Sequence, residues 1–255
     1  MVFEEIYMKE IKKILITGSQ GFIGKNLINL LSKNEAYVIY ELHRDTPWSE
    51  IENKITSIDF IFHLAGEVRP KSSDDAFNNS NVLLTEQLLS LLEEKQHYIP
   101  IVMASTIHAQ LQSNQYGITK RKAEVLIENF SQKYNVNMIN YRLPHVFGEG
   151  CKPNYNSVIS TWIYNSINDK EIVVFDRNIA MEYVYVQDIV RTFVEFLNNI
   201  KNVNGIYVYP NVTYKTTLGE VVDYLNEFKQ NQYTDTNNDF KNKLYCVYRD
   251  YLEKN

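Results

Sequence analysis

A tyrosine and a lysine four residues apart, Tyr116 and Lys120, are the side chains of this 255-residue sequence best suited to proton transfer. On a helix the two would share one face. An ammonium group beside a phenol favours the phenolate, so the pair predicts a lowered pKa for Tyr116 and proton exchange with a carbonyl or an alcohol near neutral pH. Taken alone, the pair is better explained as part of a solvated helix face.

A buried strand that ends in hydroxyl side chains lies ten residues upstream of the tyrosine. The apolar run 101–104 leads directly into Ser105 and Thr106. Thr106 is positioned to hydrogen-bond a substrate oxygen beside Tyr116, whereas Ser105 can be a plain strand-end hydroxyl. These neighbours strengthen the catalytic interpretation of the tyrosine.

Three glycines spaced three residues apart follow the apolar run 14–16 and precede an amphipathic segment. Gly18 permits a tight turn, Gly21 lets the backbone approach phosphates at the positive end of a helix, and Gly24 lets helix and strand pack closely. The context predicts a site for a nucleotide pyrophosphate. An ordinary glycine-rich turn is the alternative.

The elements that must position these residues alternate between strand and helix. Apolar runs predict strands, and 3.6-residue periodicity predicts the helices between them. This alternation predicts an α/β fold, a doubly wound parallel sheet (Rossmann fold) that binds its ligand at the carboxyl ends of the strands. The predicted strands are 12–17, 36–42, 59–65, 99–104 and 136–142, and the helices are 21–33, 80–94 and 116–134.

The pattern changes after residue 148 and predicts a second unit. We expect a dinucleotide-binding domain over residues 1–150 and a small substrate-binding lobe over residues 151–255, interleaved with the Rossmann core. The predicted elements of this part are helices at 154–169, 189–198, 218–228 and 240–252, strands at 171–175, 181–186 and 205–209, and a polar loop at 230–239.

Composition excludes several classes of protein. The net charge of −5 and the lack of a basic stripe argue against nucleic-acid binding. No apolar run is long enough to cross a membrane, so we expect no membrane association. Two distant cysteines, Cys151 and Cys246, favour a reduced cytoplasmic protein over a disulfide framework. The five histidines, at positions 43, 63, 97, 108 and 145, are scattered, and no metal site is expected.

The order of the motifs resembles that of the extended short-chain dehydrogenase/reductase superfamily. The resemblance implies that Thr106, Tyr116 and Lys120 carry proton transfer beside a nicotinamide, and that Lys120 also binds the nicotinamide ribose. The motifs lie at 17–24, 63–66, 81–82, 105–106, 116–120 and 142–148. The implied cofactor-binding residues are Gly18, Gln20, Gly21, Phe22, Ile23, Gly24, His43, Arg44, Leu64, Ala65, Gly66, Tyr116, Lys120 and Leu143.

Segments 148–159, 176–178, 210–212 and 217–220 resemble the reductase domain of bifunctional capsular enzymes of the UDP-N-acetyl-L-fucosamine pathway. That resemblance implies NADPH-dependent reduction of the 4-keto group of a UDP-2-acetamido-2,6-dideoxy-hexos-4-ulose, and a homodimer formed through helices 80–94 and 116–134. Those enzymes carry a zinc-binding cupin domain after the reductase. This chain ends where the cupin would begin, so we expect the reductase activity without a cupin domain.

The same resemblance implies a set of substrate contacts. For most of these residues a helix cap, a loop hydrogen bond or a structural histidine is the competing interpretation. His145 stands where the superfamily often has Asn, which leaves the identity of the sugar open. The predicted contacts are Arg69, His108, His145, Lys152, Asn154, Asn156, Ser157 and Arg177.

The choice of cofactor depends on the end of the second strand. NAD-binding proteins place an acid there to hold the ribose hydroxyls, whereas a cation suits the 2′-phosphate of NADP. Our register places His43 at this position with Arg44 beside it, which predicts NADP(H). If the strand ended two residues earlier, Glu41 would be the acid and NAD the cofactor.

Four functions can be weighed against one another. A 4-keto reductase is preferred, and an NAD-dependent 4-epimerase is the alternative because it uses the same three residues. A dehydratase requires an acid pair after the threonine, where this sequence has Ile107 and His108. A regulator that only binds the dinucleotide would tend to lose the pair formed by Tyr116 and Lys120.

Overall fold

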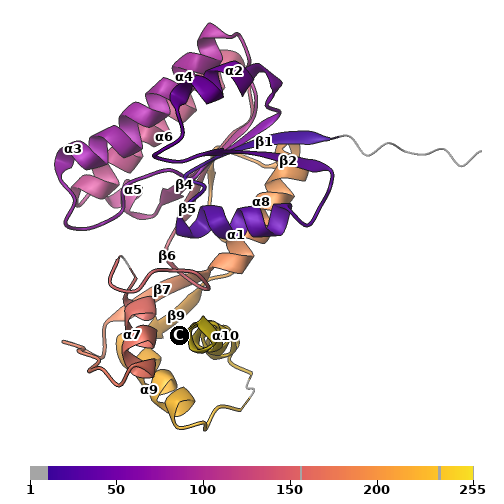
Figure 1. The fold of residues 1–255 in the computed structure, drawn as a ribbon. Coiled ribbons are helices and arrows are strands. Elements are labelled where there is room, and N and C mark those ends of the chain that lie inside the picture. The colour runs from indigo at the N-terminus through magenta and orange to yellow at the C-terminus, as the bar shows by residue number, and fades with distance from the viewer. Residues whose placement is uncertain (1–10, 156, 235–236, 255) are drawn as a thin grey trace, which may run out of the picture.

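The computed structural model describes residues 11–155, 157–234 and 237–254 (Figure 1). Its centre is a six-stranded sheet in the order β2-β1-β3-β4-β5-β8, and every neighbouring pair in it is parallel. The strands are β1 (Lys12–Thr17), β2 (Tyr37–Leu42), β3 (Phe60–His63), β4 (Ile101–Thr106), β5 (Met138–Leu143) and β8 (Tyr207–Val208).

Helices cover both faces of this sheet, which is why its strands are continuous apolar runs. In β1, Ile14 and Ile16 face the layer made by α1 (Phe22–Leu31) and α8 (Val186–Asn199). Leu15 faces the opposite layer. That layer consists of α2 (Trp48–Lys54), α4 (Leu84–Glu94) and α6 (Gln115–Tyr134). The architecture is Rossmann-like, as the sequence predicts.

The strand order reverses beside β1. The chain passes from β1 outward to β2, and β3 then returns to the other side of β1. In open parallel sheets, ligands bind at the carboxyl ends of the strands at such a point. The loops after β1 and β3, which hold the glycine motif and residues 64–66, meet there.

A smaller sheet lies beside the carboxyl edge of the large one (Figure 1). It has the order β6-β7-β9, with β6 (His145–Phe147), β7 (Ala180–Tyr185) and β9 (Tyr214–Thr217). Helices α7 (Val158–Ile167), α9 (Leu218–Lys229) and α10 (Asp239–Lys254) pack against it. The core of this lobe is rich in aromatic side chains, among them Phe147, Trp162, Tyr183 and Phe240.

Short helical elements complete the connections. They are the 3₁₀ turns η1 (Ile55–Ser57) and η3 (Ile200–Asn202), the π-helical turn η2 (Asn78–Leu83), and the one-turn helices α3 (Asp74–Phe77) and α5 (His108–Leu111). Turn η2 leads directly into α4, so the helix predicted at 80–94 begins in a different helical form. π-Helical turns are often found next to functional sites.

Most predicted elements are confirmed within a few residues, and two are wrong. The segment 171–175 forms no strand; Phe175 is fully exposed and Val173 is 57% exposed, so these residues lack the partner that a strand requires. The helix predicted from residue 154 begins at Val158. No helix within the described ranges is long and apolar enough to cross a membrane.

Candidate active site

The glycine loop between β1 and α1 has a shape that side chains would disrupt. Gly18 has a left-handed φ of +69°, and a Cβ atom there would lie 2.7 Å from the backbone nitrogen of Ala65. A Cβ atom at Gly24 would lie 2.4 Å from the carbonyl oxygen of Gly18. Both separations are far below van der Waals contact, so turn and helix can approach only with glycine at these positions.

The N-terminus of α1 leaves polar groups available. Gly21 is the N-cap residue, and no side chain caps the helix. Ser19 is fully buried, and its hydroxyl has no hydrogen-bond partner within the described part of the chain. Phe22 and Ile23 begin the helix itself. Uncapped N–H groups at a helix N-terminus form a favourable environment for a phosphate.

The loop after β3 completes this edge. The backbone N–H of Ala65 donates to Thr17 Oγ1 at 3.1 Å, and that of Leu64 donates to the Thr17 carbonyl at 3.2 Å. A Cβ atom at Gly66 would lie 3.8 Å from Lys120 Nζ. Leu143, the last residue of β5, ends at the same edge of the sheet. These predicted cofactor residues thus lie at the carboxyl ends of three strands, β1, β3 and β5.

The end of β2 presents both candidate groups for the adenosine ribose. The strand ends at Leu42, so His43 follows it directly, as in the predicted register. Arg44 beside it is exposed. The side chain of Glu41 accepts a 3.3 Å hydrogen bond from Gln20 in the glycine loop. Glu41 therefore contacts the glycine loop, and His43 and Arg44 follow it two and three residues later in the chain.

The predicted catalytic residues lie together. Thr106 ends β4, Tyr116 lies in the first turn of α6, and Lys120 follows one turn later. The hydroxyl of Thr106 is near enough to the phenol of Tyr116 to influence its pKa. The Asn114 side chain caps α6 by accepting from the Gly117 N–H at 2.8 Å. Gly117 packs closely on α5, where a Cβ atom would lie 2.4 Å from the His108 carbonyl oxygen.

The pKa of Tyr116 shifts in the direction opposite to the predicted one. Burial raises it to about 12, and the Thr106 hydroxyl only partly offsets this. Burial also lowers the pKa of Lys120 to about 8, while the Glu124 carboxylate opposes that shift. The expectation of an acidified phenol is wrong for the protein alone, because desolvation raises the pKa of Tyr116 more than the Thr106 hydroxyl lowers it. Tyr116 is accordingly a neutral phenol that holds a proton to donate.

Buried His63 and two threonine side chains form hydrogen bonds near the carboxyl ends of β1 and β3. His63 is 1% exposed, and its ring nitrogens contact Thr17 Oγ1 at 2.8 Å and Thr85 Oγ1 at 2.9 Å. Burial, together with the charge of Lys120, lowers the pKa of His63 to about 3. His63 is therefore a neutral structural residue that links β1, β3 and α4.

One predicted substrate residue, His108, lies beside the tyrosine, and a second, His145, lies beside His108. The ring centroid of His108 lies 6.3 Å from that of Tyr116 and 5.9 Å from that of His145. His145 lies 5.9 Å from the ring of Tyr183 in the lobe. Desolvation and the neighbouring His108 lower the pKa of His145. The four rings connect the catalytic corner with the smaller sheet.

Arg69 is held rigidly by a residue that we did not predict. Buried Glu67 accepts from Arg69 Nε at 2.9 Å and from its terminal nitrogen at 2.7 Å. The hydrogen bonds from Arg69 outweigh the effect of burial and lower the pKa of Glu67 to about 2. The guanidinium lies 5.5 Å from the ring of Tyr155 and remains 42% exposed. Arg69 thus spans from the β3 loop towards the lobe.

The remaining predicted substrate residues are not brought to the tyrosine by any contact. Lys152 and Asn154 are exposed, and Ser157 caps α7 by accepting from the Ser160 N–H. Arg177 donates to Asp223 at 2.7 Å and to the Gly219 carbonyl at 3.2 Å. Asn156 lies outside the described residues.

Two further residues of the site were missed by the sequence analysis. Glu67 was not singled out, and neither was Glu124, although Glu124 lies four residues after Lys120 and so extends the same helix face. Asn81, in the π-helical turn, accepts from the Glu67 N–H and donates to Thr119 on α6. Across the described ranges, no group of three or more histidine, cysteine or acidic residues is arranged to hold a metal ion.

Sequence comparisons connect this geometry with known proteins. The NAD dependent epimerase/dehydratase family matches residues 14–209. UDP-2-acetamido-2,6-beta-L-arabino-hexul-4-ose reductase of Pseudomonas aeruginosa is 33% identical over 221 residues, which are 86% of this chain and 58% of that enzyme. CDP-abequose synthase of Salmonella typhimurium is 25% identical over 77% of this chain and 73% of its own length.

Solved structures with the same fold include longer proteins. The capsular polysaccharide assembling protein CapF from Staphylococcus aureus superposes with a TM-score of 0.83 at 36% identity, covering 93% of this chain and 65% of CapF. UDP-glucuronic acid 4-epimerase from Bacillus cereus in complex with NAD superposes with a TM-score of 0.81 at 19% identity, covering 95% and 99%. The chain spans less than two thirds of CapF and of the Pseudomonas reductase.

Proposed function

Because the chain belongs to the NAD dependent epimerase/dehydratase family, we propose that it is an NADPH-dependent reductase of the 4-keto group of a UDP-linked 6-deoxy-4-keto (N-acetylamino) sugar. The observation that carries the proposal is the placement of Thr106 at the end of β4 beside Tyr116, with Lys120 one helical turn further along α6, at the same sheet edge as the glycine loop. The likeness to the Pseudomonas reductase supports the sugar class, and the likeness to CapF supports a role in surface polysaccharide synthesis.

The residues at the sheet edge fit a dinucleotide. Gly18, Gly21 and Gly24, with the uncapped N-terminus of α1 and the unpartnered Ser19 hydroxyl, would hold the pyrophosphate. The loop at residues 64–66 and Leu143 would border the remainder of the cofactor. When bound, the nicotinamide supplies the hydride for reduction of the ketone.

The protein's own contribution is to hold and move one proton. Tyr116 keeps its proton at neutral pH and donates it from Oη to the oxygen on C4 of the sugar. The Thr106 hydroxyl positions that oxygen, and the Lys120 ammonium stabilises the phenolate that remains. This assignment agrees with a phenol whose pKa burial raises rather than lowers.

Substrate contacts are proposed at two distances from the tyrosine. His108 and His145 would contact the sugar, since the ring of His108 lies beside Tyr116 and the ring of His145 lies beside His108. Arg69 would contact the sugar from the β3 loop. The remaining predicted residues, Lys152, Asn154, Asn156, Ser157 and Arg177, would lie farther out towards the UDP, with Arg177 exchanging Asp223 for a diphosphate.

NADPH is preferred because His43 and Arg44 directly follow β2, where a 2′-phosphate would lie. We further propose a division into a cofactor domain over residues 1–150 and a substrate lobe over residues 151–255, and a cytoplasmic homodimer paired through α4 and α6. One specific observation favours the alternative, an NAD-dependent 4-epimerase. The hydrogen bond between Glu41 and Gln20 places an acid against the glycine loop.

The test follows NADPH absorbance with a UDP-4-keto sugar. A reductase oxidises NADPH in step with substrate, whereas an epimerase converts sugar without net oxidation. Tyr116→Phe should lower turnover by about 10²- to 10⁴-fold with NADPH affinity nearly unchanged. Tyr134→Phe, at the other end of α6, serves as the control with normal turnover. Wild-type turnover in Tyr116→Phe would remove Tyr116 from the mechanism.

A further inference from the structure

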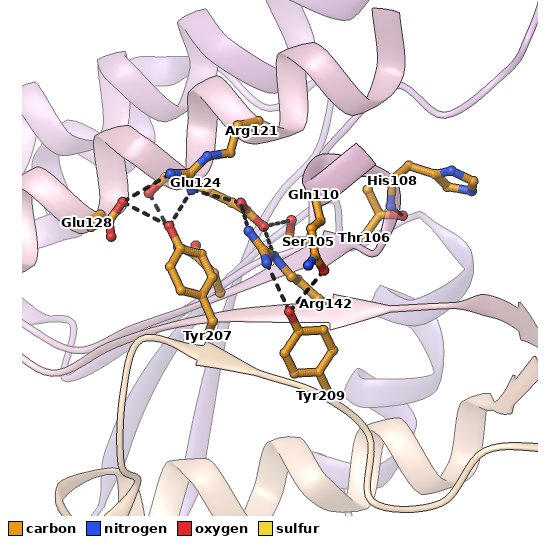
Figure 2. A network of polar contacts seen from close by, with 11 residues as sticks. Ser105, Thr106, His108, Gln110, Arg121, Glu124, Glu128, Arg142, Tyr207 and Tyr209 are labelled. Atoms are coloured by element: carbon orange, nitrogen blue, oxygen red, sulfur yellow. Dashed lines mark hydrogen bonds and ion pairs between the residues drawn. The ribbon is translucent and has the colours of Figure 1, made fainter. Parts of the chain in front are cut away.

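A buried polar network lies directly behind the catalytic corner (Figure 2). At its centre is Glu124 of α6, a carboxylate that is 0% exposed. It lies one helical turn beyond Lys120, which in turn lies one turn beyond Tyr116, so the three side chains follow one face of the helix. A buried helix face normally packs apolar side chains, and a buried charge is costly unless it is paired and hydrogen-bonded.

Glu124 is fully satisfied by donors. Arg142 binds it with two parallel hydrogen bonds, from Nε to Oε1 at 2.9 Å and from a terminal nitrogen to Oε2 at 2.8 Å. Ser105 donates to Oε1 at 2.6 Å, and Arg121 donates to Oε2 at 3.1 Å. Burial alone would raise the pKa of Glu124, but these hydrogen bonds outweigh burial and lower it. The carboxylate is therefore ionised at neutral pH.

The network also reaches both elements that surround the substrate oxygen. Ser105 immediately precedes Thr106 at the end of β4. From Arg142 a second branch runs to the Tyr209 hydroxyl at 2.9 Å and on to Gln110 at 3.4 Å, on the short helix that carries His108 (Figure 2). Helix α6, strand β4 and helix α5 are thus joined behind the site.

Stability alone does not account for this arrangement. A buried ion pair is on average no more stabilising than apolar packing of the same volume, because both charges lose their hydration. The position of Glu124 suggests an electrostatic effect on Lys120, because the Lys120 side chain is also buried, at 4% exposure. An uncompensated buried ammonium tends to lose its proton.

We infer that Glu124 is a positioning residue for the proposed reaction: its buried carboxylate keeps Lys120 charged, and through Ser105 it fixes the strand end that carries Thr106. The role of Glu124 in the reaction rests on the proposed function. The effect of Glu124 on the charge of Lys120 does not, and it can be measured separately. The opposing effect of Glu124 on the pKa of Lys120, which burial lowers to about 8, supports the inference.

The other charged groups around Lys120 do not replace Glu124. His63 on β3 is neutral, since its pKa is lowered to about 3. Glu67, beyond Gly66, is engaged by the Arg69 guanidinium. Tyr116 is a neutral phenol, with its pKa raised to about 12. Arg121 and Arg142 behind Glu124 are positive and would lower the pKa of Lys120 further if the carboxylate were removed.

The first experiment measures the charge of Lys120 directly. In protein with isotope-labelled lysine, NMR follows the Lys120 side chain through a pH titration, its signal identified by its loss in Lys120→Arg. In Glu124→Gln, the midpoint should fall by one to two pH units, on the order expected for loss of a unit charge one helical turn away. An unchanged midpoint would overturn the inference.

The matched control is Glu128→Gln. Glu128 lies one further turn along α6, pairs with the same Arg121 at 3.6 Å and accepts from Tyr207 at 2.8 Å. Because it is two turns from Lys120, its removal should leave the Lys120 midpoint in place. Equal shifts in both variants would mean a general effect of network charge and would contradict a specific role for Glu124.

The second experiment measures turnover with NADPH and the UDP-4-keto sugar across pH. The alkaline decline of kcat should move to lower pH in Glu124→Gln by the same amount as the NMR midpoint, and KM should change less than kcat. If wild type lacks reductase activity while the NMR midpoint still shifts, the proposed function fails and the electrostatic inference stands. If wild type is active, and neither the alkaline decline of kcat nor the NMR midpoint of Lys120 moves in Glu124→Gln, the inference about Glu124 fails while the proposed function stands.

Glu124→Gln leaves Arg142 buried without its partner, which can prevent folding. The double variant Glu124→Gln/Arg142→Gln removes both charges and keeps polar groups at both positions. The Lys120 midpoint should fall in this variant as well. A midpoint equal to that of wild type would overturn the inference in the same way.

Discussion

At the scale of single residues, close contacts decide the form of the cofactor loop. Gly21 and Gly24 differ in what a methyl group would meet. At Gly24 the nearest atom is the Gly18 carbonyl oxygen at 2.4 Å, whereas at Gly21 the same oxygen lies 3.0 Å away. The first contact requires movement of the backbone and the second requires only a small adjustment. We therefore predict that Gly24 serves mainly the packing of the loop against the helix, whereas Gly21 serves mainly cofactor binding.

Gly24→Ala should lower the free energy of unfolding by about 1–3 kcal/mol, as expected for overpacking. Gly21→Ala should change stability less and should weaken NADPH binding, because its methyl group would stand where phosphates approach the helix. Denaturant unfolding and titration of NADPH fluorescence measure the two effects. Equal loss of stability in both variants would contradict this division.

The polar residues of the site show what a sequence can and cannot reveal. Tyr116, Lys120 and Thr106 were predicted because their spacing agrees with a helix and a strand end, and the structure brings them together. Glu67 was missed because its partner Arg69 is only two residues away, a spacing that suggests no element. The direction of the Tyr116 pKa was wrong because burial depth is a property of the fold and not of the pair.

At the scale of elements, the N-cap of α6 positions the tyrosine. Asn114 holds the first turn of the helix, and Tyr116 lies within that turn. The matching residue of the lobe is Asn238, whose side chain accepts from the Lys241 N–H at 3.0 Å at the start of α10. The two caps are chemically alike and lie at opposite parts of the molecule.

Asn114→Ala should cost about 1 kcal/mol of stability and should lower kcat several-fold, because the first turn of α6 loses its anchor. Asn238→Ala should cost a similar amount of stability with kcat unchanged. Thermal unfolding and steady-state kinetics make the comparison. Identical kinetics in the two variants would show that the α6 cap does not position Tyr116.

The elements of the large sheet were predictable because its inner strands are buried apolar runs that alternate with helices. The elements of the lobe were less so. Strand β9 was missed, since Tyr214 and Thr216 alternate with polar residues over only four positions. The short apolar run at 172–175 was mistaken for a strand, because exposure of Val173 and Phe175 cannot be recognised without the tertiary structure.

At the scale of the whole molecule, buried titratable groups connect folding with pH. His63 has a pKa lowered to about 3 in the folded protein, compared with 6.5 for an ordinary histidine. Between pH 6.5 and pH 3, His63 is therefore protonated in the unfolded chain and neutral in the folded protein. Stability contributed by neutral His63 is complete above pH 6.5 and is lost as pH falls towards 3.

Wild-type protein should lose about 2 kcal/mol of stability between pH 7 and pH 5 through His63. The carboxylates with lowered pKa, such as Glu67, add their own loss only below about pH 4.5. His63→Asn should be less stable at pH 7 and should lose less stability than wild type over the upper interval, where the remaining slope comes from His145, whose pKa is also lowered. Urea unfolding at both pH values gives the comparison, and an equal slope in the variant would exclude His63 as the source.

Two direct junctions join the large sheet to the lobe. Leu143 of β5 and His145 of β6 are separated only by Pro144, and Tyr185 of β7 is followed at once by the first residue of α8. Strands β6 and β7 are paired at Phe147 and Tyr185, so the junctions are neighbours. A third crossing, from Val208 of β8 to Tyr214 of β9, is five residues long. Because the first junction is a single proline, the place of His145 is set by the edge of the large sheet, and the sugar contact that we propose for His145 would depend little on the outer helices.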